Sequence, residues 1–120
     1  MSIEKVVLAQ KFGVIDDCWN PRIIGELNGQ HVKIAKIHGA FDWHHHARED
    51  ELFLVHRGRF RMECRDHTVE LAPVDMLIVT RGPAQRPGAA EEAEIVVLEP
   101  EGTLRAAQGA ADRRVLQTGA

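Results

Sequence analysis

The sequence G-A-F-D-W-H-H-H-A-R-E-D-E-L-F-L-V-H-R-G, from Gly39 to Gly58, decides the fold and holds the candidate chemistry. Side chains two residues apart on an extended strand point to the same face, so His44 and His46 project together. Glu51, presented from the next strand, can complete a set of two imidazoles and one carboxylate. Such a set, with coordination positions left open, is typical of sites for divalent transition metals such as Fe, Mn, Ni or Zn.

The same stretch resembles the first motif of the cupin family, which runs Gly, a short spacer, His-x-His, three or four residues, Glu, six residues and Gly. In this chain the motif reads Gly39, His44-x-His46, four residues, Glu51, six residues and Gly58. The spacer after the first glycine is one residue shorter than the common form. The resemblance implies that the two histidines and the glutamate are metal ligands in a small barrel.

The second cupin motif resembles Gly-(x5)-Pro-x-Gly-x-x-His, and it supplies a fourth ligand from a facing strand. Aligned on Gly82, this chain has Val74 in place of the glycine, Thr80 in place of the proline and Gln85 in place of the ligand histidine. An amide carbonyl is a weaker ligand than imidazole for Fe, Ni and Zn. Gln85 can bind the metal through its carbonyl oxygen or hydrogen-bond a bound water, but a pocket without metal is also consistent with this substitution.

The composition is that of an ordinary globular domain. The 120 residues suffice for one core, and a net charge of -3 gives no footprint for nucleic acid or an anionic membrane. No apolar run approaches the roughly 20 residues of a membrane span. The N-terminus is too short and too acidic for a signal peptide, so we expect a cytoplasmic protein. Two cysteines far apart in sequence predict neither a disulfide framework nor a Cys-x-x-Cys site.

The first half of the chain predicts short strands. Residues 3–12 fit a strand or one or two helical turns, and Asn28-Gly29 is a strong hairpin signal. Residues 31–37 alternate as a strand, with a bulge expected at Gly39, and a second strand is expected over 41–46. The segment 51–56 is apolar on both faces, which indicates burial on both sides.

The second half continues the pattern. Phe60, Met62 and Cys64 alternate inward, Met76 to Val79 reads as a buried strand, Pro87-Gly88 as a loop and residues 94–99 as the last strand. Many short strands with regular turn signals predict an all-β jelly-roll barrel, or double-stranded β-helix. We expect one cupin-like domain over 1–120, with its core at about 19–104, an irregular N-terminal segment and a mobile tail from Glu101.

For several other residues, a structural or surface role is the default interpretation. His45 alternates outward, and Glu49 replaces Glu51 only if the register slips. The isolated histidines are expected to be exposed or satisfied by neighbours; these are His38, His56 and His67. Trp43 and Phe41 can line the pocket mouth or the core, and Arg81 and Arg86 flank Gln85 with a surface role as the default.

The combined prediction is a small metal-binding cupin of unassigned activity, with His44, His46, Glu51 and Gln85 around a divalent cation and a small molecule in the barrel. The alternatives are a metal-dependent enzyme of dioxygenase or isomerase type, which the resemblance implies, and a metal-free ligand-binding module. The chain contains no tyrosine, so a tyrosine hydroxyl is excluded as a general acid. A homodimer is expected, because strands that are apolar on both faces exceed the needs of one small sandwich.

Overall fold

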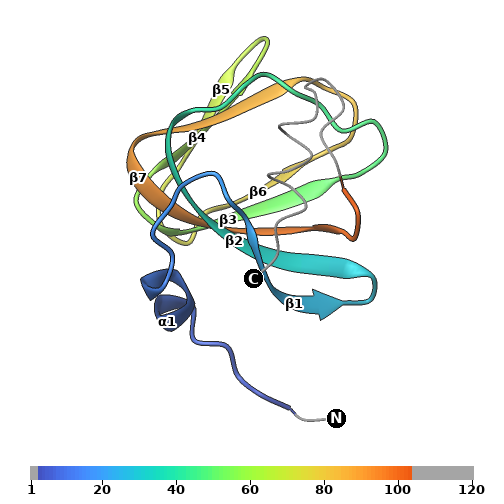
Figure 1. Ribbon diagram of the computed structural model, residues 1–120. Coiled ribbons are helices and arrows are strands. Elements are labelled where there is room, and N and C mark those ends of the chain that lie inside the picture. The colour runs from blue at the N-terminus through green and yellow to red at the C-terminus, as the bar shows by residue number, and fades with distance from the viewer. Residues whose placement is uncertain (1–2, 104–120) are drawn as a thin grey trace.

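The computed structural model describes residues 3–103 (Figure 1). A short helix precedes seven strands: α1 (Leu8–Gly13), β1 (Arg22–Leu27), β2 (Gln30–Ala40), β3 (Glu51–Arg57), β4 (Phe60–Cys64), β5 (Thr68–Leu71), β6 (Met76–Val79) and β7 (Gln85–Pro100). Within these residues, no helix has the length and apolar character that a membrane crossing requires.

β7 organises the barrel, because it is long enough to pair with three other strands. Its second half lies between β2 and β3, and its first half pairs with β4, all antiparallel. The strand order is β1-β2-β7-β3-β6, with β4 and β5 attached through the first half of β7. Figure 1 shows β7 curving around the barrel from one side to the other. The all-β jelly-roll barrel predicted from the sequence is confirmed.

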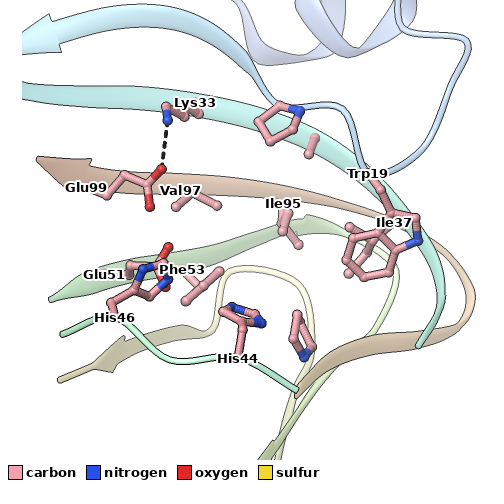
Figure 2. A pocket seen from close by; sticks show the side chains of 13 residues that line it. Trp19, Lys33, Ile37, His44, His46, Glu51, Phe53, Ile95, Val97 and Glu99 are labelled. Carbon is pink, nitrogen blue, oxygen red and sulfur yellow. Dashed lines mark hydrogen bonds and ion pairs between the residues drawn. The ribbon is translucent and has the colours of Figure 1, made fainter. Parts of the chain in front are cut away.

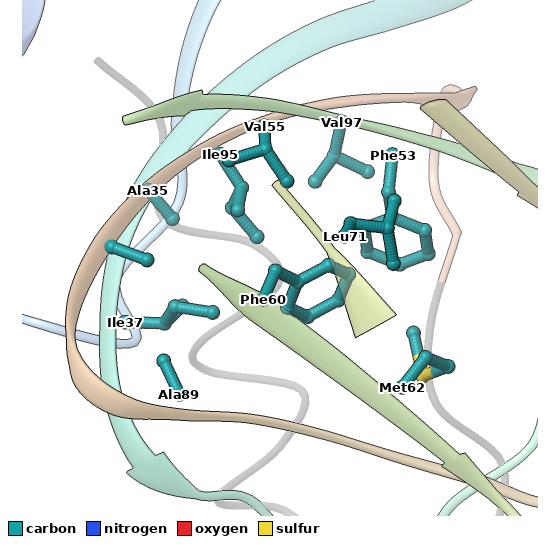
Figure 3. Packing of buried hydrophobic residues seen from close by; sticks show 11 residues of the cluster. Ala35, Ile37, Phe53, Val55, Phe60, Met62, Leu71, Ala89, Ile95 and Val97 are labelled. Atoms are coloured by element: carbon teal, nitrogen blue, oxygen red, sulfur yellow. The ribbon is translucent and has the colours of Figure 1, made fainter. Parts of the chain in front are cut away.

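The barrel interior is filled by side chains from β2, β3, β4, β5 and β7 (Figure 3). Phe60 and Met62 face inward as predicted, at 1% and 0% exposure, and Cys64 is only half-buried. A second, smaller cluster lies outside the barrel, where Phe12 and Ile15 pack on Ile34 and Val96. The ambiguous segment 3–12 is therefore helical at its end, because that helix buries Phe12 against the outer face of the sheet.

Two local predictions were wrong: the strand expected over residues 41–46, and the loop expected at Pro87-Gly88. The segment 41–46 is not a regular strand; it contains one bridge, between His44 and Gln85. Pro87 and Gly88 lie inside β7 instead of in a loop. The glycine is there for space, because a Cβ on Gly88 would come within 2.9 Å of the Arg61 guanidinium and 3.1 Å of the Gly39 carbonyl oxygen.

The buried strand predicted at Met76 to Val79 was also wrong in part. β6 is an edge strand whose outward side chains, Met76 and Ile78, are 59% and 56% exposed. At the C-terminal end, the Glu101 amide donates to the Gly29 carbonyl and Thr103 is buried. The remainder of the predicted tail, 104–120, lies outside the described residues.

The glycines of the first motif have different physical reasons. Gly39 and Gly58 both have positive φ, +82° and +84°, which L side chains rarely adopt. A Cβ on Gly39 would meet nothing within 4 Å, whereas one on Gly58 would lie 3.0 Å from the Ala93 Cα and the Glu92 carbonyl oxygen. A side chain at position 58 is therefore disfavoured both by the positive φ and by the close approach of the β7 backbone.

We expect Gly58→Ala to destabilise the fold by about 2–5 kcal/mol, because backbone strain and overpacking against β7 add. The matched control, Gly39→Ala, adds only the strain of a left-handed residue and should cost about 1–2 kcal/mol. Urea unfolding followed by circular dichroism measures both. Equal losses in the two variants would contradict the role of the β7 backbone at Gly58.

Candidate metal centre

Backbone hydrogen bonds, and not a continuous strand, position the two histidines. The His44 amide donates to the Gln85 carbonyl at 2.9 Å, and the Gln85 amide donates back to the His44 carbonyl at 2.8 Å. The Gly82 amide donates to the His46 carbonyl at 2.8 Å. These three bonds hold the segment against the start of β7, and both imidazoles are 4% exposed. The two rings therefore reach the interior, as alternation predicted, from an irregular segment.

The three side chains of the predicted N,N,O set converge inside the barrel. His44, His46 and Glu51 each offer a ligand atom within 4.8 Å of the other two, and all three residues are buried. Glu51 begins β3 and faces inward, and its Oε1 lies 2.8 Å from Nε2 of His46. Figure 2 shows these side chains lining one side of a pocket. The structure thus brings together the residues that the first motif singles out.

The environment of His44 prepares one ring nitrogen for coordination. Its Nδ1 lies 3.0 Å from the Asp42 carbonyl oxygen. A carbonyl oxygen only accepts, so Nδ1 carries the proton and the lone pair of Nε2 is directed into the site. A metal-ligating histidine commonly donates its other N–H to a carbonyl or carboxylate in this way.

Gln85 lies among the three ligands, as the alignment on Gly82 predicted. It is 1% exposed, and its Nε2 donates to Glu51 Oε1 at 3.0 Å and lies 3.3 Å from His44 Nε2. Its Oε1 is buried and has no hydrogen-bond partner among residues 3–103. A buried carbonyl oxygen without a donor is costly, and a half-turn of the amide would direct it toward His44, His46 and Glu51, where a cation would satisfy it. The residues present therefore fit a metal ion.

A buried lysine–glutamate pair, which the sequence reasoning missed, adjoins Glu51. Lys33 on β2 donates to Glu99 on β7 at 2.8 Å, and the two residues are 3% and 1% exposed. Both could have been found by parity, because Lys33 shares the inward face of Ile37, and Glu99 that of Ile95. A charge at an inward position of a strand indicates a partner inside the barrel.

The carboxyl groups of Glu51 and Glu99 hydrogen-bond one another, and their pKa values move apart. Burial and the hydrogen bond with Glu51 raise the pKa of Glu99 to about 9. Burial opposes the ionisation of Glu51 too, but hydrogen bonds from Glu99 and His46 outweigh it and lower the pKa of Glu51 to about 2. Two adjacent buried carboxyls cannot both ionise, so at neutral pH the proton resides on Glu99 and Glu51 is the anion.

The site opens into a cavity of about 70 Å³, which is room for roughly five water molecules. Its walls are mostly apolar, and they include Ala35, Ile37, Phe53, Ile95 and Val97. In Figure 2, Lys33 and Glu99 lie toward one end, with His46 and Glu51, and Trp19 lies at the opposite end. The sequence did not predict that Trp19 lines the pocket, because its loop has no alternation of apolar and polar residues that would indicate an inward face.

The aromatic and basic candidates near the site have separate positions. Phe41 stacks on Trp19, with ring centroids 4.9 Å apart. Trp43 does not line the pocket, and the Arg65 guanidinium lies 3.9 Å above its ring. The two flanking arginines pair with carboxylates, Arg81 with Asp50 and Arg86 with Glu63, which agrees with the default surface role.

The remaining candidates also follow their defaults. Glu51, and not Glu49, faces the barrel interior, so the register did not slip. His56 lies on the outer face of β3, where it contacts Glu94 at 2.8 Å and stacks on Phe12. His67 contacts the neighbouring Asp66 on the surface.

Comparison with known proteins agrees with this geometry. A cupin-2 domain protein of Shewanella frigidimarina has a solved structure that is 34% identical, with a TM-score of 0.79, and the match covers 80% of this chain and 94% of that one. The chain belongs to the cupin family. A solved structure from Neisseria meningitidis is 23% identical to this cupin over 82% of its length and 100% of the other chain, with a TM-score of 0.75.

Two further matches carry less information, one because of its short coverage and the other because of its low identity. The uncharacterized protein YdbB of Bacillus subtilis is 38% identical over 64 residues, which are 52% of this cupin and only 57% of YdbB. The structure of KdgF from Halomonas sp. is 20% identical, with a TM-score of 0.58 over 68% of this chain and 79% of that chain, and shares the fold alone. No family model matches the sequence.

The raised pKa of Glu99 predicts that this cupin, freed of metal by a chelator, loses stability as pH rises. Folding raises this pKa from 4.5 to about 9, so the folded state retains a proton that the unfolded chain releases above about pH 4.5. The contribution is complete below pH 4.5 and disappears toward pH 9. The depressed pKa of Glu51 acts only below its ordinary value of 4.5, outside this window.

Glu99→Gln should remove this decline, because the amide accepts from Lys33 and donates to Glu51 at every pH. Urea unfolding at about pH 5, 6.5 and 8 gives the free energies. Glu70→Gln, at an exposed carboxyl on β5, is the matched control and should keep the wild-type slope. A wild-type free energy of unfolding that is flat from pH 5 to 8 would show that Glu99 ionises normally.

Proposed function

We propose that this cupin holds one divalent transition-metal ion with His44, His46 and Glu51, and binds a small molecule in the adjoining pocket. The convergence of the three buried ligand atoms within 4.8 Å is the observation that carries the proposal. Imidazole and carboxylate ligands suit Fe, Mn, Ni or Zn. Three protein ligands leave coordination positions for water or a bound molecule, as in catalytic zinc sites.

Gln85 takes the place of the fourth ligand in this proposal. Its Nε2 currently donates to Glu51, and its Oε1 is the buried acceptor without a partner. Rotation of the amide by half a turn exchanges these two atoms and directs the carbonyl oxygen toward the three ligands. An amide oxygen is a weaker ligand than imidazole for these metals, so the affinity is expected to lie below that of a site with three histidines.

The ion would supply a Lewis acid or a bound hydroxide. The chain's own groups orient the site: the Asp42 carbonyl fixes the His44 tautomer, and Glu99 hydrogen-bonds Glu51. Lys33 in turn holds Glu99. Enzymatic activity of dioxygenase or isomerase type remains an expectation from the family. A metal-free ligand-binding module is the alternative, and it is supported by the amide nitrogen of Gln85, which donates to Glu51 and approaches His44 and so engages two of the three proposed ligands.

Protein purified without added metal should contain close to one equivalent of a transition metal by elemental analysis. After chelation, calorimetric titration with Zn²⁺ or Ni²⁺ should give one site. His46→Ala should weaken it by more than about 100-fold, because loss of even an outer hydrogen-bond partner costs 10–100-fold. Gln85→His should tighten it by about tenfold, or about 1.4 kcal/mol.

His45→Ala is the matched control, because this neighbouring histidine is not part of the converging group. It should bind metal as the wild type does. Absence of metal in the purified protein, together with a melting temperature that Zn²⁺ and Ni²⁺ leave unchanged, would reject the metal site and favour the metal-free module.

The pocket favours a short organic acid, with its carboxylate at the metal and Lys33 end and its aliphatic part among Ala35, Ile95 and Val97. Butyrate should raise the melting temperature of the metal-loaded protein more than 1-butanol does. Ala35→Leu should abolish the difference, because it fills the cavity without touching the ligands. Equal effects of butyrate and 1-butanol would contradict an acid-binding pocket and leave the metal titration unaffected.

A further inference from the structure

The loop between α1 and β1 forms the outer wall of the pocket. Two of its residues, Trp19 and Pro21, line the cavity, and both are half-buried. Within residues 3–103, every other side chain that lines the cavity is buried. The loop is therefore the part of the described chain that separates the cavity from solvent, and Figure 2 shows Trp19 at the end opposite His46 and Glu51.

The backbone at Trp19 has a conformation that tryptophan rarely adopts. Its φ is +60°, in the left-handed region that favours glycine. The Cβ of a bulky residue makes this conformation costly, so it persists only where the surrounding structure holds it in place. Residues with such strain cluster at ligand sites, and this one adjoins the cavity beside the candidate metal centre.

Three contacts hold Trp19 against β2 and the segment that follows it. The Trp19 amide donates to the Lys36 carbonyl oxygen at 2.8 Å, and the indole Nε1 donates to the His38 carbonyl oxygen at 2.9 Å. The indole stacks on Phe41, with ring centroids 4.9 Å apart. Both N–H groups of the residue are thus satisfied by β2, and the ring has a fixed position at the end of the cavity.

We propose that Trp19 is the specificity-determining residue of the pocket, and that its indole sets the greatest length of the acid that binds there. This inference rests on the proposed function, in which the carboxylate lies at the metal and Lys33 end and the aliphatic chain extends toward Trp19. The cavity of about 70 Å³ ends at the indole, and its room for roughly five water molecules suits an acid of about four carbon atoms.

The walls between the two ends explain why chain length is the property that is selected. They are formed by Ala35, Ile37, Phe53, Ile95 and Val97, none of which has a hydrogen-bonding side chain. An aliphatic chain gains about fourfold in affinity for each methylene that such walls remove from water. The gain ends at the indole, because a ring that is held by three contacts does not move aside for an added methylene.

A purely structural role for Trp19 is the competing explanation. The indole packs against the buried barrel cluster, so its removal lowers the free energy of unfolding under either explanation. The dependence of binding on chain length separates the two, because a residue with only a structural role affects short and long acids equally.

Calorimetric titration of the metal-loaded full chain with acetate, butyrate and hexanoate tests the proposal. The wild type should bind butyrate most tightly and hexanoate at least tenfold more weakly. Trp19→Gly removes the indole and also the strain, because glycine adopts positive φ readily. This variant should bind hexanoate at least tenfold more tightly than the wild type does, and more tightly than it binds butyrate.

Trp43→Ala is the matched control, because Trp43 is also half-buried but does not line the pocket. It should keep the wild-type order of the three acids. Trp19→Leu, which shortens the side chain but retains an apolar contact with the barrel, keeps the test valid if Trp19→Gly fails to fold. Circular dichroism confirms that each variant is folded.

Two results would overturn the role of Trp19 and leave acid binding intact. One is a wild type that binds hexanoate at least as tightly as butyrate. The other is a change in the dissociation constants of butyrate and hexanoate by the same factor in the Trp19 variants. A wild type that binds none of the three acids would overturn this inference together with the acid-binding pocket, and the metal titration would still stand by itself.

Discussion

The reciprocal pair of backbone hydrogen bonds between His44 and Gln85 is the constraint on which the rest of the site depends. It is the single bridge in an otherwise irregular segment, and it fixes that segment to the beginning of β7. Because β7 also pairs with β3, the same strand places both histidines opposite Glu51. The bridge thereby brings the two histidines of one irregular segment to the carboxylate at the start of β3, without a regular strand beneath the histidines.

The cluster behind the ligands shows how the barrel tolerates buried charge. Removing a charged group from water is costly unless it gains partners, and here the partners form a continuous row from Lys33 through Glu99 and Glu51 to His46. Each member lies on a different element, so the row also ties β2, β7 and β3 to the histidine segment. The position of Glu51 is set by these protein neighbours alone.

Much of this arrangement could be predicted from the sequence, for identifiable reasons. His44, His46 and Glu51 are separated by fixed spacings within one stretch, and alternation gives their common face. Gln85 was found by alignment with the family motif. Lys33 and Glu99 were missed because each looks like a solvated charge until its inward parity is noticed, and their pairing depends on a register between distant strands. The role of Gly88 could not be predicted either, because its constraint comes from Arg61 and Gly39.

The apolar pattern of β3 and β6 is ambiguous in a way that local sequence cannot resolve. A strand with hydrophobic residues on both faces reads as buried, whether the second cover comes from its own chain or from another copy. β3 has Phe53 and Val55 buried inside and Leu52 and Leu54 half-buried outside, so one strand serves both the barrel and the outer face. Glu51 begins this strand, so packing on the outer face would fix a ligand on the inner face through the same backbone. The misreading of β6 as a buried strand therefore follows from an apolar pattern whose outer side chains, Met76 and Ile78, the residues 3–103 leave exposed.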